Sequence, residues 1–222
     1  MTVTFQDVDV ADLVPSLGAK HTLKVTNNST VDGHNAVLFQ TSPSLPDGAV
    51  PLAWLARLSR PHTETTLEWT LRYCFVWGRQ GNLHAGVDYG AGGQLDADLS
   101  RHNLARLVHG GSAFGFRREP GSHPAGALAI VEDESVPGAG AYHRGCAGIG
   151  MDGAATFVAP TEPGAGLHFD PHPDYWLGLA RYAAGAVVDP DAVLAPVRLV
   201  YPNGKTRAEA TFTGESWTIS YR

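Results

Sequence analysis

The sequence predicts an all-β protein, a two-layer antiparallel β-sandwich preceded by a short N-terminal arm or helical turn. Glycine (26) and proline (15) recur between short apolar runs along the 222 residues, which suits many strands joined by turns. Several of these runs alternate apolar with polar residues and are rich in β-branched and aromatic side chains. We assign residues 1–20 to the arm and residues 21–222 to a single sandwich domain, a size that one β domain can reach.

The chain opens with the arm and two short strands. Within the arm, the stretch DVADLVPSL favours a helical turn or a segment that packs elsewhere on the protein. The strands HTLKVTN (21–27) and NAVLFQ (35–40) follow, each with the length and composition of a half-buried strand.

Residues 65–77 carry the clearest strand pattern in the sequence. Leu67, Trp69 and the residues that alternate with them form an apolar face, while Glu68 and Arg72 lie on the opposite face. The segment therefore predicts one long antiparallel strand that anchors the sheet.

The middle of the chain is less regular. Residues 100–109 fit a helix through Leu104, Leu107 and Val108, but they also fit a strand in which Leu104 and Val108 share a face with Arg106. Further strands are expected at LAIVED, ATFVA and YWLGLARY, which are residues 128–133, 155–159 and 175–182.

Two turns organise the C-terminal end. VRLVY and RAEATF flank Pro202–Lys205, where Asn-Gly supplies the positive φ angles of a tight hairpin turn. A second turn at Thr213–Glu215 leads into SWTISY, in which Trp217, Ile219 and Tyr221 share one face.

Composition and charge restrict the possible partners. The 16 Lys and Arg residues against 22 Asp and Glu residues leave a net charge of -6, so we expect no nucleic-acid partner and no binding to anionic membranes. No run approaches the ~20 apolar residues of a membrane span, and no transmembrane segment is expected. Because the N-terminus lacks a signal-peptide pattern, we expect a cytoplasmic protein or one exported without a recognisable signal. We expect Cys74 and Cys146 to be buried thiols, although two cysteines also permit one disulfide.

Two motifs invite a catalytic interpretation that their surroundings do not support. Residues 148–153 match GxGxxG, but a dinucleotide site needs a strand before the motif and a helix after it, and neither is predicted. We therefore expect turns or a glycine-rich strand there, and no dinucleotide. The acidic run Glu132–Glu134 contains the carboxylate pair that acid-base catalysis uses, but we interpret it as solvated loop charge.

The stretch LHFDPHPDYW (167–176) is the best candidate for a metal site. The chain has ten histidines but only three lysines, and imidazole is a common ligand of copper and zinc. The prolines exclude a helix, and in an extended chain His168 and His172 are too far apart to bind one ion without a turn. One of the two could instead join histidines from other strands, namely His84, His102, His109 or His143. The alternative is a proline-stiffened turn in which His172 binds backbone groups.

Two of the five tryptophans are candidate ligand contacts. Trp69, Trp77 and Trp217 fall on apolar strand faces and are expected in the core, whereas Trp54 and Trp176 are less constrained. Our first hypothesis is a binding or interaction protein whose partner is a small molecule, a glycan or a second copy of the chain. The alternative is a histidine-dependent metalloenzyme of oxidase or cyclase type, with one open-sided metal site.

Seven segments together resemble the RhiA-like bacterial proteins, a rhizosphere-expressed family. In chain order they are LKVTNNST, AVLFQTSP, LAWLAR, LEWTLRYCFVWG, GIGMDGAATFV, PHPDYW and TFTGESWTISY. The resemblance covers roughly residues 20–221. It implies a small soluble bacterial protein and supplies no catalytic residues.

Overall fold

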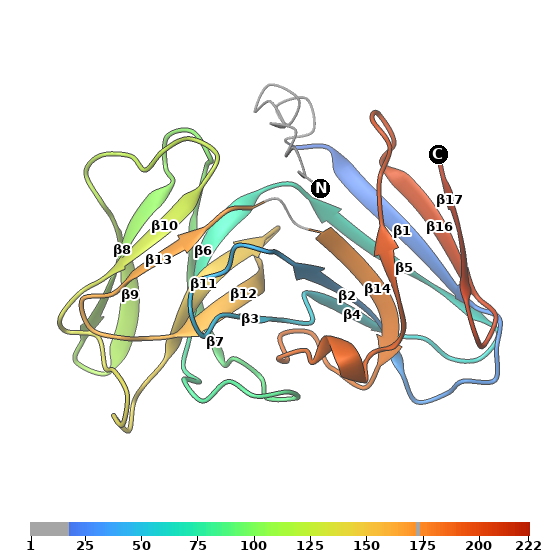
Figure 1. Cartoon of the computed structure of the whole chain (residues 1–222), viewed down its shortest axis with the longest axis horizontal. Helices are drawn as coiled ribbons and strands as arrows, with labels where there is room; N and C mark the ends of the chain where they lie inside the picture. The colour runs from blue at the N-terminus through green and yellow to red at the C-terminus, as the bar shows by residue number, and fades with distance from the viewer. Residues whose placement is uncertain (1–17, 172–173) are drawn as a thin grey trace, which may run out of the picture.

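The computed structural model describes residues 18–171 and 174–222, and its regular structure is almost entirely β-strand (Figure 1). The predicted all-β, sandwich-like fold is confirmed, and its sheets form two sandwiches where a single one was expected. The first described strand begins at Lys20, and the expected arm lies outside the described residues except for its last positions. Within the described ranges, no helix has both the length and the apolar character needed to cross a membrane.

Four sheets form two sandwiches, which we call the first and the second sandwich. The first sandwich packs one sheet against another, in the strand orders β17-β16-β1-β5 and β15-β14-β2-β4. Their bounds are β17 (Trp217–Tyr221), β16 (Arg207–Phe212), β1 (Lys20–Asn27), β5 (Thr63–Thr70), β15 (Leu194–Leu199), β14 (Asp174–Ala180), β2 (Asn35–Thr41) and β4 (Leu55–Leu58).

The second sandwich packs the sheet β3-β12-β11-β6-β7 against the sheet β13-β10-β8-β9. Their bounds are β3 (Val50–Pro51), β12 (Ala154–Pro160), β11 (Cys146–Met151), β6 (Tyr73–Gly78), β7 (Ala91–Asp96), β13 (Gly166–Phe169), β10 (Leu128–Glu132), β8 (Leu104–Gly110) and β9 (Ala113–Arg118). Two pairings, β1 with β16 and β8 with β10, are parallel, and the others are antiparallel.

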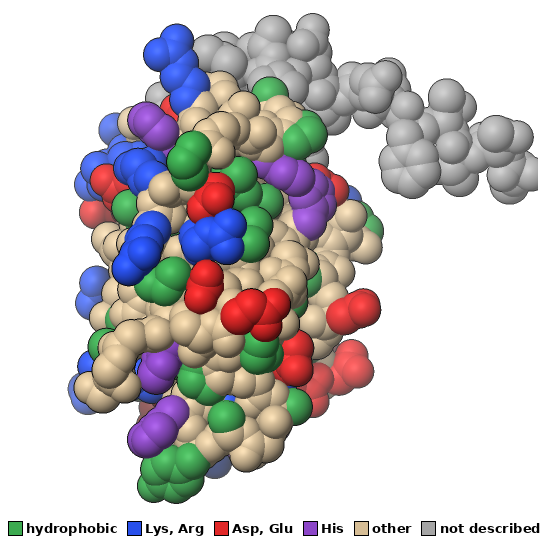
Figure 2. All heavy atoms as spheres, turned by 90° about the vertical axis from the view of Figure 1, so that its left-hand side faces the viewer, with side chains coloured by type: hydrophobic (Ala, Val, Ile, Leu, Met, Phe, Trp, Pro, Cys, Tyr) green, Lys and Arg blue, Asp and Glu red, His purple; other side chains and the backbone are tan. Residues whose placement is uncertain are grey.

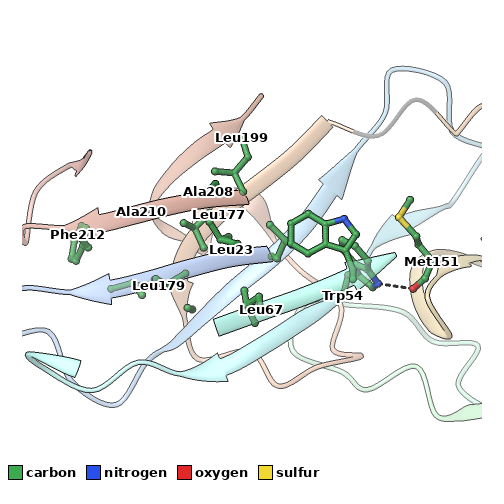
Figure 3. Packing of buried hydrophobic residues seen from close by; sticks show 14 residues of the cluster. Leu23, Trp54, Leu67, Met151, Leu177, Leu179, Leu199, Ala208, Ala210 and Phe212 are labelled. Atoms are coloured by element: carbon green, nitrogen blue, oxygen red, sulfur yellow. Dashed lines mark hydrogen bonds between the residues drawn. The ribbon is translucent and has the colours of Figure 1, made fainter. Parts of the chain in front are cut away.

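Each sandwich has its own core, formed by the alternate residues of each strand that point toward the facing sheet. In the first sandwich, Leu23 on β1 and Leu67 on β5 meet Leu177 and Leu179 on β14 (Figure 3). In the second, alternate residues of β8 and β10 point inward, as Leu107 and Ile130 do. Removal of this apolar surface from water, at about 25 cal/mol per Å², is what holds the paired sheets together.

The second sandwich is nested inside the first in chain order. All its strands except β3 come from residues 73–169, which lie between β5 and β14 (Figure 1). The prediction of one strand over residues 65–77 is therefore wrong. The strand breaks after Thr70, because Thr70 and Arg72 both bind the carboxylate of Asp152, and the chain passes there from one sandwich to the other.

The C-terminal end follows the prediction in one turn and departs from it in the other. β16 and β17 pair as a hairpin, as expected. β15 and β16 do not pair, although the turn between them forms, with Lys205 N–H donating to the Pro202 carbonyl oxygen at 2.9 Å. That turn carries the chain from one sheet to the facing sheet, so the predicted hairpin is wrong.

The segment that fitted either a helix or a strand is a strand, because residues 104–110 form β8. Its buried face consists of Ala105 and Leu107, the face opposite the one that the strand pattern indicated. Leu104 and Val108 are half-buried on the other face.

Candidate functional site

Trp54 lies in the core of the first sandwich. Its side chain is 1% exposed, and its indole N–H donates to the carbonyl oxygen of Met151 at 2.9 Å, as Figure 3 shows. In this position the ring has no surface to offer a ligand, so the placement does not support the expected ligand contact.

Trp176 is half-buried on the outer face of β14. Its indole N–H donates to Oγ1 of Thr41 at 3.0 Å, and its ring packs near Val188 and Val193. A ligand contact at Trp176 stays a prediction.

The GxGxxG segment forms the β11–β12 hairpin. Asp152 and Gly153 make its two-residue turn, with φ angles of 53° and 78°. A Cβ atom at Gly148 would lie 1.9 Å from the carbonyl oxygen of Phe157, so this glycine permits close approach of two strands. The segment has a structural role, as the strand interpretation expected.

His168 lies on β13 in contact with a histidine that the sequence did not single out. Its Nδ1 is 2.8 Å from Nε2 of His123, and its Nε2 is 3.1 Å from Oδ1 of Asp170. His172, the other predicted ligand, lies outside the described residues. Within the described ranges, no three His, Cys, Asp or Glu side chains are grouped to hold one metal ion.

The position of His123 is fixed by Asn103, whose side chain is fully buried. Asn103 Oδ1 accepts from the backbone N–H of His123 at 3.0 Å, and Nδ2 donates to the carbonyl oxygens of His123 and Pro124 at 2.9 and 3.1 Å. A buried amide that satisfies three backbone groups holds its loop firmly. The β9–β10 connection therefore presents His123 to β13 in a defined position.

His168 also lines a cleft of about 540 Å³ at one edge of the second sandwich. The cleft lies between the β2–β3 loop (44–48), the end of β10, and the segment that joins β12 to β13. Its other lining side chains of note are Leu45, Glu132, Arg144, Glu162 and Leu167. Figure 2 views the molecule from the side of the second sandwich and shows hydrophobic side chains scattered among charged ones and histidines.

Glu132 is the unusual residue of this cleft, because it is a carboxyl group that is only 1% exposed. Its Oε2 accepts from the backbone N–H of Glu162 at 2.6 Å, while Oε1 has no partner in the described residues. Desolvation raises the pKa of Glu132 from 4.5 to about 7, against the lowering effect of the Glu162 N–H. Near neutral pH the group therefore exchanges between its protonated and ionised forms.

Arg144 lies beside this carboxyl group and is held by two contacts. Its Nε donates to the carbonyl oxygen of Thr161 at 3.0 Å, and its guanidinium is 3.1 Å from Oε2 of Glu162. These contacts fix one positive group in the lining of the cleft.

A second cleft of about 520 Å³ lies where β5 passes into β6. It is lined by Asp96, Asp98 and Asp152, but the carboxylate of Asp152 is already bonded to Thr70 and Arg72. Asp98 likewise accepts from Ser100 at 2.6 Å. Because the carboxylates of Asp98 and Asp152 serve turns and strand ends, we take the cleft at Glu132 as the candidate site.

The interpretation of Glu132 as solvated loop charge is wrong, and the sequence held a signal that would have corrected it. Glu132 is the last residue of the strand LAIVE. It lies on the same face of the strand as Leu128 and Ile130, both of which are core residues. For His123 there is no comparable signal, since it lies 45 residues from His168 and no local pattern joins them. The two cysteines are buried free thiols, as expected.

Comparison with known proteins places the chain in a family. The sequence model of the RhiA family matches residues 18–222. Protein RhiA of Rhizobium leguminosarum bv. viciae is 28% identical over 195 residues, covering 84% of this chain and 79% of that protein. The comparison with solved structures found no significant match. Because the family match spans the two sandwiches and the cleft at Glu132, the chain belongs to the RhiA family.

Proposed function

We propose that this RhiA-family protein binds a small molecule in the cleft at Glu132. The observation that carries the proposal is the buried carboxyl group that lines the cleft with one oxygen unpartnered among the described residues. A buried polar atom without a partner costs about 1–3 kcal/mol. Proteins commonly retain such an unpartnered atom where a ligand or water supplies the missing hydrogen bond.

The size and lining of the cleft support a small ligand. Its volume of about 540 Å³ lies within the range of ligand pockets, roughly 300–1,000 Å³. Leu45 and Leu167 supply apolar contact, and Glu132, Arg144 and Glu162 supply a few polar groups. That combination is typical of small-molecule sites, in which polar groups fix the orientation of a partly apolar ligand.

The charges in the cleft favour a ligand that donates hydrogen bonds. The carboxyl groups of Asp47, Glu132 and Glu162 outnumber the single guanidinium of Arg144, which already contacts Glu162. Amines and hydroxyl compounds match this lining better than anions do. Among the described residues, the lining contains no Phe, Tyr or Trp ring that could stack on a sugar ring.

The proposal can be tested with a defined set of compounds. The isotope-labelled chain would be titrated with small aliphatic amines, amino alcohols and polyols, and amide chemical shifts would be followed. We expect shifts that saturate at residues 44–48 and 160–168, with affinity reduced about tenfold or more in Glu132→Gln because a charged hydrogen bond is lost. Glu134→Gln is the matched control, since Glu134 lies two residues away and is exposed.

Shifts confined to the region of Trp176, or equal binding by Glu132→Gln and Glu134→Gln, would contradict the proposal. Shifts near Trp176 with polyols alone would instead support the glycan hypothesis. The metalloenzyme alternative is not favoured, because an open-sided catalytic site commonly has three protein ligands and the described residues contain no such group.

A further inference from the structure

We propose that His123 and His168 form a divalent metal site on the rim of the cleft, completed by water and selective for copper(II) over zinc. The inference goes beyond small-molecule binding and does not depend on it, since the two imidazoles lie outside the Glu132 carboxyl group and its contacts. The site differs from the one that the sequence suggested, because its second ligand is His123.

The hydrogen bonds around His168 determine which of its nitrogens is free. An ionised carboxylate only accepts, so Nε2 of His168 carries the proton that is donated to Asp170 at 3.1 Å. In the neutral ring, Nδ1 therefore has a lone pair, and it accepts a hydrogen bond from the Nε2–H of His123 at 2.8 Å. One imidazole is thus held with its coordinating nitrogen toward the other.

The spacing of the two nitrogens fits adjacent positions around copper. Imidazole binds metals at about 2.0 Å, so two neighbouring ligands at right angles are separated by about 2.8 Å. Copper(II) prefers this tetragonal arrangement of nitrogen and oxygen ligands. The hydrogen bond that joins the two rings already holds the nitrogens at this separation, 2.8 Å. To bind the ion, His123 has to move its proton from Nε2 to Nδ1, and both rings have to turn until the two lone pairs meet at the ion. The 50% exposure of the His168 side chain leaves room for that rotation.

Tetrahedral zinc fits the pair less well. Its ligands would be about 3.3 Å apart at the same bond length, so the two nitrogens would have to separate. The general affinity order of nitrogen sites also places copper(II) above zinc. Geometry and ligand chemistry therefore point to the same ion.

The ring of His168 and the backbone of His123 are both held in place by neighbouring side chains. A coordinating histidine almost always donates its other ring N–H to a carboxylate, carbonyl or water, and Asp170 fills that role for His168. Asn103 holds the backbone of His123 through three hydrogen bonds. A bound ion would tie the β9–β10 connection to β13 at the rim of the cleft.

The test uses the full-length, untagged chain after treatment with a chelator. Copper(II) sulfate and zinc sulfate would be titrated separately and followed by calorimetry, and the copper form would be examined by pulsed electron paramagnetic resonance. We expect one copper per chain at this site, coupled to two imidazole nitrogens, and weaker binding of zinc. His123→Ala and His168→Ala should each lower copper affinity at least tenfold and leave one coupled imidazole or none. Asp170→Ala should lower it by roughly 10- to 100-fold without changing the number of coupled imidazoles.

His84→Ala is the matched control, because His84 is exposed and has no contact with the pair. Thermal unfolding of each metal-free variant checks that the fold is retained, which we expect because His168 is exposed and His123 and Asp170 are only half-buried. Unchanged copper affinity in His123→Ala or His168→Ala, or zinc binding as tight as copper binding, would overturn the proposal. Glu132→Gln separates the two proposals, because it should weaken small-molecule binding and leave copper binding unchanged.

Discussion

At the scale of single residues, Glu132 couples the stability of the fold to pH. Burial raises its pKa from 4.5 to about 7, so between these values the folded chain keeps a proton that the unfolded chain has lost. The unfolded state then binds fewer protons, and the free energy of unfolding falls as the pH rises from about 4.5 to 7. Above about pH 7 this contribution stays constant.

We therefore expect the Glu132→Gln variant to lose this pH dependence. Relative to the variant, the wild-type chain should lose on the order of 2–3 kcal/mol of unfolding free energy between pH 4.5 and pH 8, since each pKa unit corresponds to 1.36 kcal/mol. Urea unfolding of both chains at several pH values measures the difference. Glu134→Gln should keep the wild-type slope, and a parallel pH dependence in wild type and Glu132→Gln would show that the carboxyl group is not the cause.

At the scale of elements, the β11–β12 hairpin depends on glycines that no other residue can replace. The two strands approach so closely that a Cβ atom at Gly148 would lie 1.9 Å from the Phe157 carbonyl oxygen and 2.7 Å from the Cα atom of Val158. Both neighbouring atoms belong to the backbone of β12, so no side-chain rotation can remove the clash. The GxGxxG pattern thus reflects strand packing, and the same close approach explains why a cofactor motif can occur by chance here.

Gly148→Ala is expected to destabilise the protein by about 3 kcal/mol or more, at or beyond the upper end of ordinary overpacking costs. Gly115→Ala on β9 is the matched control, since nothing lies within 4 Å of its added Cβ atom. Alanine there should be neutral or stabilising by up to about 1 kcal/mol, because a strand glycine loses more conformational freedom on folding. Guanidinium unfolding measures both variants, and similar costs at the two positions would refute the steric explanation.

At the scale of the whole molecule, the nested chain order joins the two sandwiches. The segment that forms the second sandwich leaves the first sandwich after β5 and returns to it at β14. The short strand β3 lies between β2 and β4 in the chain, yet it pairs with β12 of the second sandwich. Neither sandwich can therefore be completed by one continuous stretch of the chain.

This topology predicts a single unfolding transition, which the two cysteines can report. Burial raises the pKa of Cys74 to about 11 and that of Cys146 to about 12, so both thiols should be unreactive toward a thiol reagent in the folded chain at pH 8. We expect thiol labelling, which reports on the second sandwich, to follow the same denaturant dependence as tryptophan fluorescence. Labelling at lower denaturant than the fluorescence change would show that the second sandwich opens independently.

The sequence by itself determined the all-β class and the positions of most strands, because alternation and turn residues act over a few neighbouring positions. It also named His168 as a candidate metal ligand, from the His- and Asp-rich stretch 167–176, and that role stays a prediction. Only the tertiary structure decided which strands pair, why the strand over residues 65–77 breaks, and that β15 and β16 lie in facing sheets. It alone brought His123 to His168 and enclosed Glu132 in a cleft. The physical reason is that sheet assignment and burial depend on contacts between residues far apart in the chain, which no local pattern records.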